Sequence, residues 1–263
     1  MLSRIAKVLA AFLGVAALLL AGIALMPARA VRLATDQVEG LMVGSTEGRL
    51  FSGQAELWYR GVDLGRMAWS FRPGALLGLE LRADWRVAHR DFNGWGTAAL
   101  GAGTTEFGGD ANIEALAVNR FLAQYHILVD GTFEVRGLAI RRDPQKINAE
   151  GTLRWTGGRT TYRLSGQMHD VELPGMVATL ASVDGEPVLE VVSVEDAARL
   201  LSVRLDGDGW AHIGVTARLT ALAGNPWRHD GDEDAVVVTV SERLFQPVGR
   251  GGRVGRNVPV SGG

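Results

Sequence analysis

Residues 79–87 carry the pattern that most restricts the fold of this chain. They read Leu-Glu-Leu-Arg-Ala-Asp-Trp-Arg-Val, with an apolar side chain at every odd position and a charged one at every even position. Because successive side chains of a β-strand point to opposite faces, the alternation separates the apolar side chains from the charged ones. The segment predicts a strand in a sheet with one apolar face and one solvated face.

The same period of two returns along the chain. Residues 147–155 repeat it clearly. Weaker versions occupy residues 62–71, 127–135, 162–168, 200–205, 213–219 and 235–240. Turn-forming residues separate them: Arg60-Gly61, Asp130-Gly131, Gly157-Gly158, Asp184-Gly185 and residues 206–209. The series predicts a mainly β fold, a curved antiparallel sheet that is half-barrel or sandwich-like, with few short helices.

Two helices are predicted within this β-rich region. Ser193-Val194-Glu195-Asp196 resembles a capped helix start, and residues 196–201 continue it with good helix formers. Residues 111–122 form the second candidate, although Asn112, Val118 and Asn119 are weak helix formers.

The N-terminus contains a long apolar segment. Arg4 and Lys7 precede residues 8–26, a run without any charge that would span about 30 Å as a helix. The positive residues before it predict a cytoplasmic N-terminus and an exported remainder. Pro27-Ala28-Arg29-Ala30 resembles a cleavage site, so a signal sequence is the alternative to an anchor. The length of the run favours a single-pass anchor in the bacterial inner membrane.

These features divide the chain into three parts. Residues 1–30 are the predicted cytoplasmic N-terminus and membrane anchor, or signal sequence. Residues 31–245 are the predicted periplasmic β-rich domain. Residues 246–263 are rich in Gly and Arg and have no apolar period, which predicts a disordered tail.

Composition excludes several kinds of site. The chain has no cysteine, which rules out disulfides, Cys-bound zinc, iron–sulfur clusters and thiol nucleophiles. The net charge of −2 gives no general attraction to nucleic acid. Close metal-ligand spacing is absent among the five histidines, His89, His126, His169, His212 and His229.

Two partial motifs also fail. Asp230-x-Asp232-x-Asp234 opens like a calcium loop, but Ala235 and Ser241 stand where the motif needs Gly and Glu. Residues 94–99 match a dinucleotide-binding fingerprint, but the glycine- and threonine-rich sequence after them disfavours the helix that it requires. The sequence therefore predicts no catalytic residue, no metal ligand and no cofactor-binding residue, and a protein that is not an enzyme.

A family resemblance begins at residues 48–53, Gly-Arg-Leu-Phe-Ser-Gly. This segment resembles an element that the type II secretion system protein N family (general secretion pathway protein N) has soon after its membrane segment. The similarity continues through residues 67–73 and 76–78, and again at residues 151–158, Gly-Thr-Leu-Arg-Trp-Thr-Gly-Gly. Arg49 and Phe51 stand where the family usually has Thr and Trp. The matching residues, for which a structural role is predicted, are Gly48, Phe51, Gly53, Trp69, Pro73, Leu77, Gly151 and Trp155.

The resemblance implies a non-enzymatic inner-membrane accessory component of the machine that exports folded proteins across the outer membrane. Its implied partners are other type II secretion components, namely the inner-membrane platform and the secretin, which strand edges could bind by β-augmentation. An AsmA-like lipid-binding envelope protein is the alternative, because the one-sided strands at 79–87 and 147–155 could hold acyl chains. A closed core is the ordinary interpretation of the same pattern.

Overall fold

The computed structural model describes residues 40–49, 52–144, 146–164, 166–227 and 232–243. The expected anchor or signal sequence at residues 1–30 and the expected tail at residues 246–263 lie outside these described residues. None of the helices in the described part of the chain has the length and apolarity needed to cross a bilayer.

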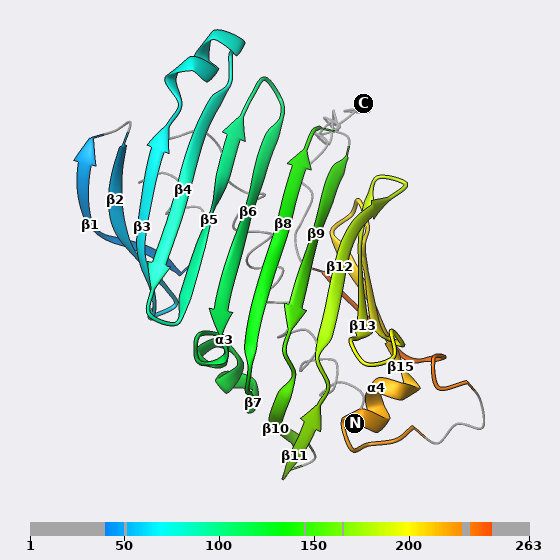
Figure 1. Ribbon diagram of the computed structural model, residues 1–263. Helices are drawn as coiled ribbons and strands as arrows, with labels where there is room; N and C mark the ends of the chain where they lie inside the picture. The colour runs from blue at the N-terminus through cyan, green and yellow to red at the C-terminus, as the bar shows by residue number, and fades with distance from the viewer. Residues whose placement is uncertain (1–39, 50–51, 145, 165, 228–231, 244–263) are drawn as a thin grey trace, which may run out of the picture.

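One large antiparallel sheet of 13 strands dominates the molecule (Figure 1). Its strand order is β1-β2-β3-β4-β5-β6-β8-β9-β12-β13-β14-β15-β16, so almost every strand pairs with its neighbours in sequence. The end strands β1 and β16 do not pair with each other, and the sheet is therefore open. The predicted mainly β, antiparallel architecture with few short helices is confirmed, and the sheet is not closed into a barrel.

The strands of this sheet are β1 (Leu41–Arg49), β2 (Ser52–Tyr59), β3 (Val62–Phe71), β4 (Leu81–His89), β5 (Phe92–Leu100), β6 (Thr105–Glu114), β8 (Thr132–Arg142), β9 (Ile147–Trp155), β12 (Met176–Val183), β13 (Glu186–Ser193), β14 (Arg199–Leu205), β15 (Trp210–Thr216) and β16 (Val236–Arg243). A 3-10 helix, η1 (Pro73–Gly78), joins β3 to β4.

Tight turns make these long strands reverse direction. Arg60 (φ 49°) and Gly61 (φ 81°) join β2 to β3, and Asp184 (φ 54°) and Gly185 (φ 82°) join β12 to β13. Two successive residues with positive φ are typical of the type I′ turn, whose twist matches that of the flanking strands. Both turns lie where the sequence predicts them.

The register separates the sheet into two faces. Trp85 of β4 lies opposite Gly96 of β5, which lies opposite Gly109 of β6, while Arg86 lies opposite Trp95. We call the face that carries Trp85 the inner face and the face that carries Arg86 the outer face. The alternation of residues 81–87 therefore has the predicted effect of sorting apolar from charged side chains.

Two insertions interrupt the main sheet and pair with each other. The first, between β6 and β8, contains α3 (Ala115–Leu122), η2 (Ala123–Tyr125) and β7 (Ile127–Val129). The second, between β9 and β12, contains β10 (Gly158–Leu164) and β11 (Gln167–Leu173). They form a separate sheet of three strands in the order β11-β10-β7.

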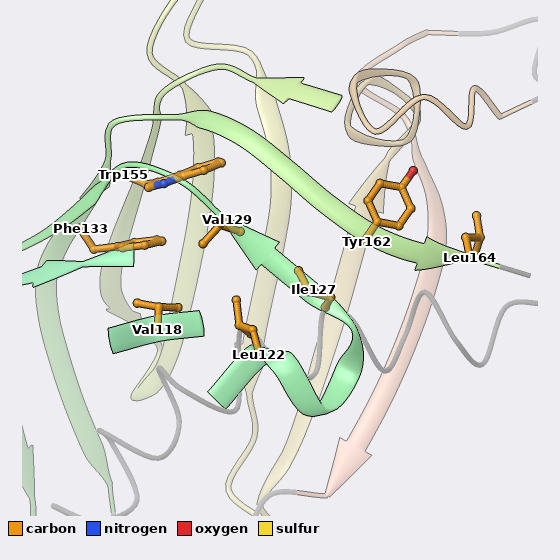
Figure 2. Packing of buried hydrophobic residues seen from close by; sticks show 8 residues of the cluster. All are labelled: Val118, Leu122, Ile127, Val129, Phe133, Trp155, Tyr162 and Leu164. Carbon is orange, nitrogen blue, oxygen red and sulfur yellow. The ribbon is translucent and has the colours of Figure 1, made fainter. Parts of the chain in front are cut away.

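The small sheet packs on the inner face at one end of the main sheet. Figure 2 shows Val118 of α3 and Val129 of β7 beside Phe133 and Trp155 of β8 and β9, while Tyr162 and Leu164 of β10 lie at the other end of the cluster. The eight buried residues of this cluster are Val118, Leu122, Ile127, Val129, Phe133, Trp155, Tyr162 and Leu164. The insertions thus supply the second layer that the inner face needs at this end.

A second core covers the C-terminal part of the inner face. Val191, Leu201, Val215 and Val238 lie opposite one another on four successive strands, and all are buried. The short helix α4 (Ala217–Leu222) follows β15 and packs Leu219 against this ladder. Because burial is deepest here, β12–β16 form the best-packed part of the sheet.

The prediction of a helix at residues 196–201 is wrong. Ser193 Oγ accepts a hydrogen bond from Glu195 N at 3.2 Å, and Asp196 Oδ1 accepts one from Ala198 N at 3.1 Å. These side chains close a tight turn instead of capping a helix. Leu200 and Leu201 then enter β14, where their exposed fractions are 0% and 5%, so core packing overrides local helix propensity.

Other boundaries shift by a few residues. Residues 111–114 belong to β6, and the expected second helix begins only at Ala115. The expected strand at 213–219 ends at Thr216, whose side chain accepts a hydrogen bond from Leu219 N and starts α4. The expected strand at 127–135 is divided into β7 and β8, which belong to different sheets, and the expected strand at 162–168 is divided by the β10–β11 hairpin.

Candidate interaction surface

The family-motif residues near the N-terminus meet on adjacent strands. Gly48 of β1 lies opposite Gly53 of β2, and Gly53 lies opposite Trp69 of β3. A Cβ at Gly48 would lie 2.7 Å from Gly53 Cα, and one at Gly53 would lie 2.8 Å from Trp69 Cζ2. Glycine at both positions therefore allows the β1 backbone and the Trp69 indole to approach β2 closely.

An aromatic row extends this contact across the inner face. Trp69 lies opposite Trp85, whose ring stacks on Phe107 of β6 with centroids 5.0 Å apart. A Cβ at Gly109 would lie 2.7 Å from Trp85 Cζ2, so the indole lies over this glycine. Trp85 Nε1 is buried without a hydrogen-bond partner among the described residues. Because these glycines have no side chain, the large aromatic rings can lie directly against the strand backbone on the inner face.

The later motif residues form a second group. Gly151 adopts φ 145°, and a Cβ there would lie 2.9 Å from Leu138 Cα. Trp155 stacks on Phe133 with centroids 5.8 Å apart and donates a hydrogen bond from Nε1 to Asp130 O at 2.8 Å. Trp155 has an exposed fraction of 4% and lies in the core in Figure 2, so its hydrogen bond fixes the β7–β8 connection, which joins the two sheets, to this core.

The remaining motif residues lie in or near the β3–β4 connection. Pro73 begins η1, where its fixed φ and missing N–H suit the first turn, and Leu77 lies in the same 3-10 helix. Phe51 lies outside the described residues. The structure thus brings Gly48, Gly53 and Trp69 together and holds Gly151 and Trp155 in a separate group. The structural role predicted for these residues stays a prediction.

The outer face is covered by ion pairs between neighbouring strands. Arg72 donates hydrogen bonds from Nε and Nη2 to the Asp84 carboxylate, at 2.9 and 2.5 Å. The bond from Arg72 lowers the pKa of Asp84 below its usual value. Arg82 donates hydrogen bonds to Glu80 Oε1 and lies 3.6 Å from Glu106 Oε2. Since both signs alternate, this face presents no single-sign field that would attract a polyanion.

A charged cluster joins α3 to the end of the main sheet. Arg120 of α3 donates a hydrogen bond to Asp91 Oδ2 at 2.5 Å, and the Asp91 side chain is 13% exposed. His89 Nδ1 accepts the Asp91 N–H at 3.2 Å, so a neutral imidazole carries its proton on Nε2, the nitrogen nearer to Asp63. Sequence reasoning missed this cluster, because Asp91 and Arg120 belong to separate elements and share no local motif.

The cluster lines a shallow hollow at the β2–β3 and β4–β5 turns. Its lining residues are Gly61, Val62, Asp63, His89, Arg90 and Arg120. Asp91 is engaged by Arg120 and Arg90, so its negative charge is compensated within the fold. The ion pair between Arg120 and Asp91 holds α3 against the end of the main sheet.

The other described histidines lie apart from this cluster. His212 contacts Ser241 and Asp206, His169 stacks on Tyr162, and His126 ends η2 with φ 58°. Within the residues that the structure describes, no group of three or more histidine and carboxylate side chains is arranged to hold a metal ion. His229 lies outside the described residues.

The segment that resembles a dinucleotide-binding fingerprint is part of a strand. Residues 94–99 lie within β5, and the chain continues through a turn into β6 instead of a helix. A Cβ at Gly96 would lie 1.9 Å from Gly108 O, so this glycine permits close contact between strands. The segment lacks the helix N-terminus that would bind a pyrophosphate.

Comparison with known proteins gives one match. The family model described as "Type II secretion system (T2SS), protein N" matches residues 39–226, which include all strands from β1 to β15. No curated protein and no solved structure matches the chain.

Proposed function

This chain belongs to the type II secretion system protein N family, and from this membership we propose that it is a non-enzymatic accessory component at the bacterial inner membrane. In this proposal the β-rich domain lies in the periplasm and helps to assemble the machine or to export folded proteins across the outer membrane. The single observation that carries the proposal is the family match over residues 39–226.

The membrane location is supported by the sequence. Residues 8–26 are long enough to cross a bilayer as a helix, and Arg4 and Lys7 precede them. An anchor there would limit how far β1 can lie from the membrane, because only 14 residues separate Met26 from Leu41. At most about 3.5 Å per residue, that linker reaches about 50 Å.

Partners of the exported domain are proposed to be proteins. The outer face carries paired charges, and the open edges of the main sheet carry backbone groups that a partner strand can bind. The proposed partners are other type II secretion components, namely the inner-membrane platform and the secretin. Arg and carboxylate side chains pair with one another on the outer face of the described strands, and this supports a specific protein partner over nucleic acid.

Deleting the gene tests the secretory role. The culture-supernatant and periplasmic proteomes of the deletion strain would be compared with those of the wild type and of a complemented strain. Secreted proteins should disappear from the medium and accumulate in the periplasm, and the complemented strain should recover. An unchanged supernatant would count against a role in export.

A cysteine placed in the chain tests the location. Because the chain has no cysteine, Thr179→Cys on the exposed outer face of β12 creates a single labelling site. A membrane-impermeant maleimide should label this variant in intact spheroplasts, while Ser3→Cys should react only after lysis. Equal labelling of both variants in intact spheroplasts would contradict the proposed topology. The mass of the purified chain would show whether residues 1–30 remain attached.

Lipid handling is the second candidate, and one observation favours it. On the inner face, Ala83, Trp85 and Val87 of β4 remain partly exposed, whereas Val215 and Val238 at the other end are 1% exposed. A partly exposed apolar face can hold acyl chains. Mass spectrometry of the chain purified in a lipid-free detergent would test this function. If no co-purifying phospholipid or lipopolysaccharide is found, lipid handling is ruled out.

A further inference from the structure

The described part of the chain has four sheet edges, and they differ in how they are protected. Edge strands expose unpaired backbone groups, which natural proteins block with charges, bulges or covering side chains. The edges are β1 and β16 of the main sheet and β7 and β11 of the small sheet.

Three of these edges are protected. Asn119 covers β7, since its side-chain amide donates to Val129 O and accepts from Val129 N, both at 2.9 Å. Strand β1 has a bulge between Val43 and Thr46 and carries the charged Glu47. Strand β11 exposes Asp170 and Glu172 alternately along its edge.

Strand β16 is the edge with the longest run of β-branched residues; its bulge lies at its start, and its charged residues, Glu242 and Arg243, lie at its end. Residues 236–240 read Val-Val-Val-Thr-Val, all β-branched, with no charge, glycine or proline. Such residues favour pairing in a sheet. The bulge at the start of the strand leaves 238–243 in regular register with β15. Among the described residues, β15 is the only strand that pairs with β16, so the other edge of β16 has no partner strand.

We propose that β16 pairs antiparallel with β16 of a second copy of this chain, with Thr239 on the two-fold axis. A two-fold axis that passes perpendicular to the sheet reverses the strand direction, and so the pair that it relates is antiparallel. In this register Val238 of one copy lies opposite Val240 of the other. The ladder that ends at Val238, buried at 1% exposure opposite Val215, then continues across the axis.

The charges of β16 select this antiparallel arrangement. The strand follows an acidic turn, Asp232-Glu233-Asp234, and ends with Glu242 and Arg243, whose side chains point to opposite faces of the sheet. Arg218 contacts Glu233 at 3.3 Å and Asp234 at 2.9 Å, which leaves the turn with net negative charge. Antiparallel self-pairing brings Arg243 of each copy beside the acidic turn of the other, whereas a parallel pair would place acidic turn against acidic turn.

A disulfide test follows from the register. Residues directly opposite on antiparallel strands have Cα atoms about 4.5–5.5 Å apart, within the range that a disulfide spans. Full-length Thr239→Cys, oxidised in isolated membranes, should therefore form a cross-linked dimer at twice the monomer mass. Thr179→Cys, exposed on the same face of an interior strand, is the matched control and should remain monomeric.

A charge test provides an independent measurement. Thr239→Lys places two like charges opposite each other at the axis, and it should weaken dimerisation several-fold in detergent-solubilised protein, as measured by light scattering. Thr179→Lys should leave the association unchanged. Circular dichroism of each variant would establish that the sheet is intact.

Other outcomes overturn the proposal. Equal cross-linking of Thr239→Cys and Thr179→Cys would show random collision, and a monomer at all concentrations would exclude the dimer. A cross-link from Thr239→Cys to a different envelope protein would show that β16 binds a heterologous strand. None of these results bears on secretion by the deletion strain, so the proposed function can fail or hold separately.

Discussion

Close backbone approach at Gly48 is the residue-scale feature that shapes the N-terminal edge of the sheet. Its φ of 100° lies in the region that favours glycine, and a side chain would collide with the β2 backbone. Gly61 has a similar φ of 81°, but nothing lies within 4 Å of a Cβ built there. A side chain at Gly61 would cause backbone strain alone, whereas one at Gly48 would cause both backbone strain and a steric collision.

Substituting these two glycines should therefore have unequal effects. Gly61→Ala should cost about 1 kcal/mol of unfolding free energy from strain alone. Gly48→Ala should cost about 2–3 kcal/mol, because the β1–β2 pair must also move apart. Urea titration followed by tryptophan fluorescence measures both. Equal losses would show that the contact at Gly53 can relax.

Asp206 is a single residue whose contribution to the stability of the fold depends on pH. Its carboxylate accepts hydrogen bonds from Trp210 N at 2.9 Å and Asp208 N at 3.0 Å, and His212 lies 3.1 Å away. The bond from Trp210 N is the main cause that lowers the pKa of Asp206, with His212 next. The ionised carboxylate thus stabilises the turn between β14 and β15.

Replacing Asp206 should change how stability depends on pH. Because the pKa is lower in the folded state, the contribution is present above the unfolded-state pKa of about 3.9 and is lost as pH falls through the folded value. Asp206→Ala should lower the melting temperature at pH 7, and the difference from wild type should shrink below about pH 4. A difference independent of pH would contradict this account.

At the scale of elements, the two insertions matter most. Neither α3 with β7 nor β10 with β11 could bury its own apolar face, and together they form the small sheet around Trp155 (Figure 2). Arg120 and Asp91 attach α3 to the main sheet, and Asn119 occupies the β7 edge. These contacts join segments that lie far apart in the sequence.

Removing the Trp155 side chain should destabilise this junction strongly. Trp155→Ala should cost about 3–5 kcal/mol, because it leaves a cavity beside Phe133 and an unpaired Asp130 carbonyl. Trp95→Ala is the matched control, since Trp95 is 39% exposed on the outer face, and it should cost less than about 1 kcal/mol. Similar losses for the two variants, measured by chemical denaturation, would refute the assignment of Trp155 to the core.

On the scale of the whole molecule, packing is uneven along the sheet. The inner face is mostly buried over β12–β16, where Ala211, Ile213 and Val215 have exposed fractions of 1–2%. Over β1–β5 most inner-face residues are only partly buried. The open sheet in Figure 1 thus has, by its exposed fractions, a well-packed C-terminal end and a more accessible N-terminal end.

Hydrogen exchange should report this gradient. Amides of β14 and β15 should exchange most slowly, close to the rate of global unfolding, and those of β1 and β2 should exchange faster through local opening. Mass spectrometry of the full-length chain in detergent measures both regions. Uniform protection from β1 to β15 would mean that another surface covers the N-terminal half.

The sequence by itself determined the secondary structure where the period of two was strong. The clear pattern at 147–155 is β9 and the weaker one at 62–71 is β3, both with the predicted bounds, because alternation reports burial directly, whereas the strand predicted at 79–87 begins only at Leu81. Turn residues such as Asp184-Gly185 were equally predictable, since positive φ restricts the residue types that fit. The sequence also indicated the family through short glycine and tryptophan motifs.

Only the tertiary structure decided the rest. Residues 196–201 have helix propensity, yet Leu200 and Leu201 join β14 because the core offers them complete burial. The pairing of β7 with β10 and of Arg120 with Asp91 left no local trace, since each contact joins separate elements. The open edge at β16 likewise follows from strand order, because pairing between distant segments depends on how the whole chain packs.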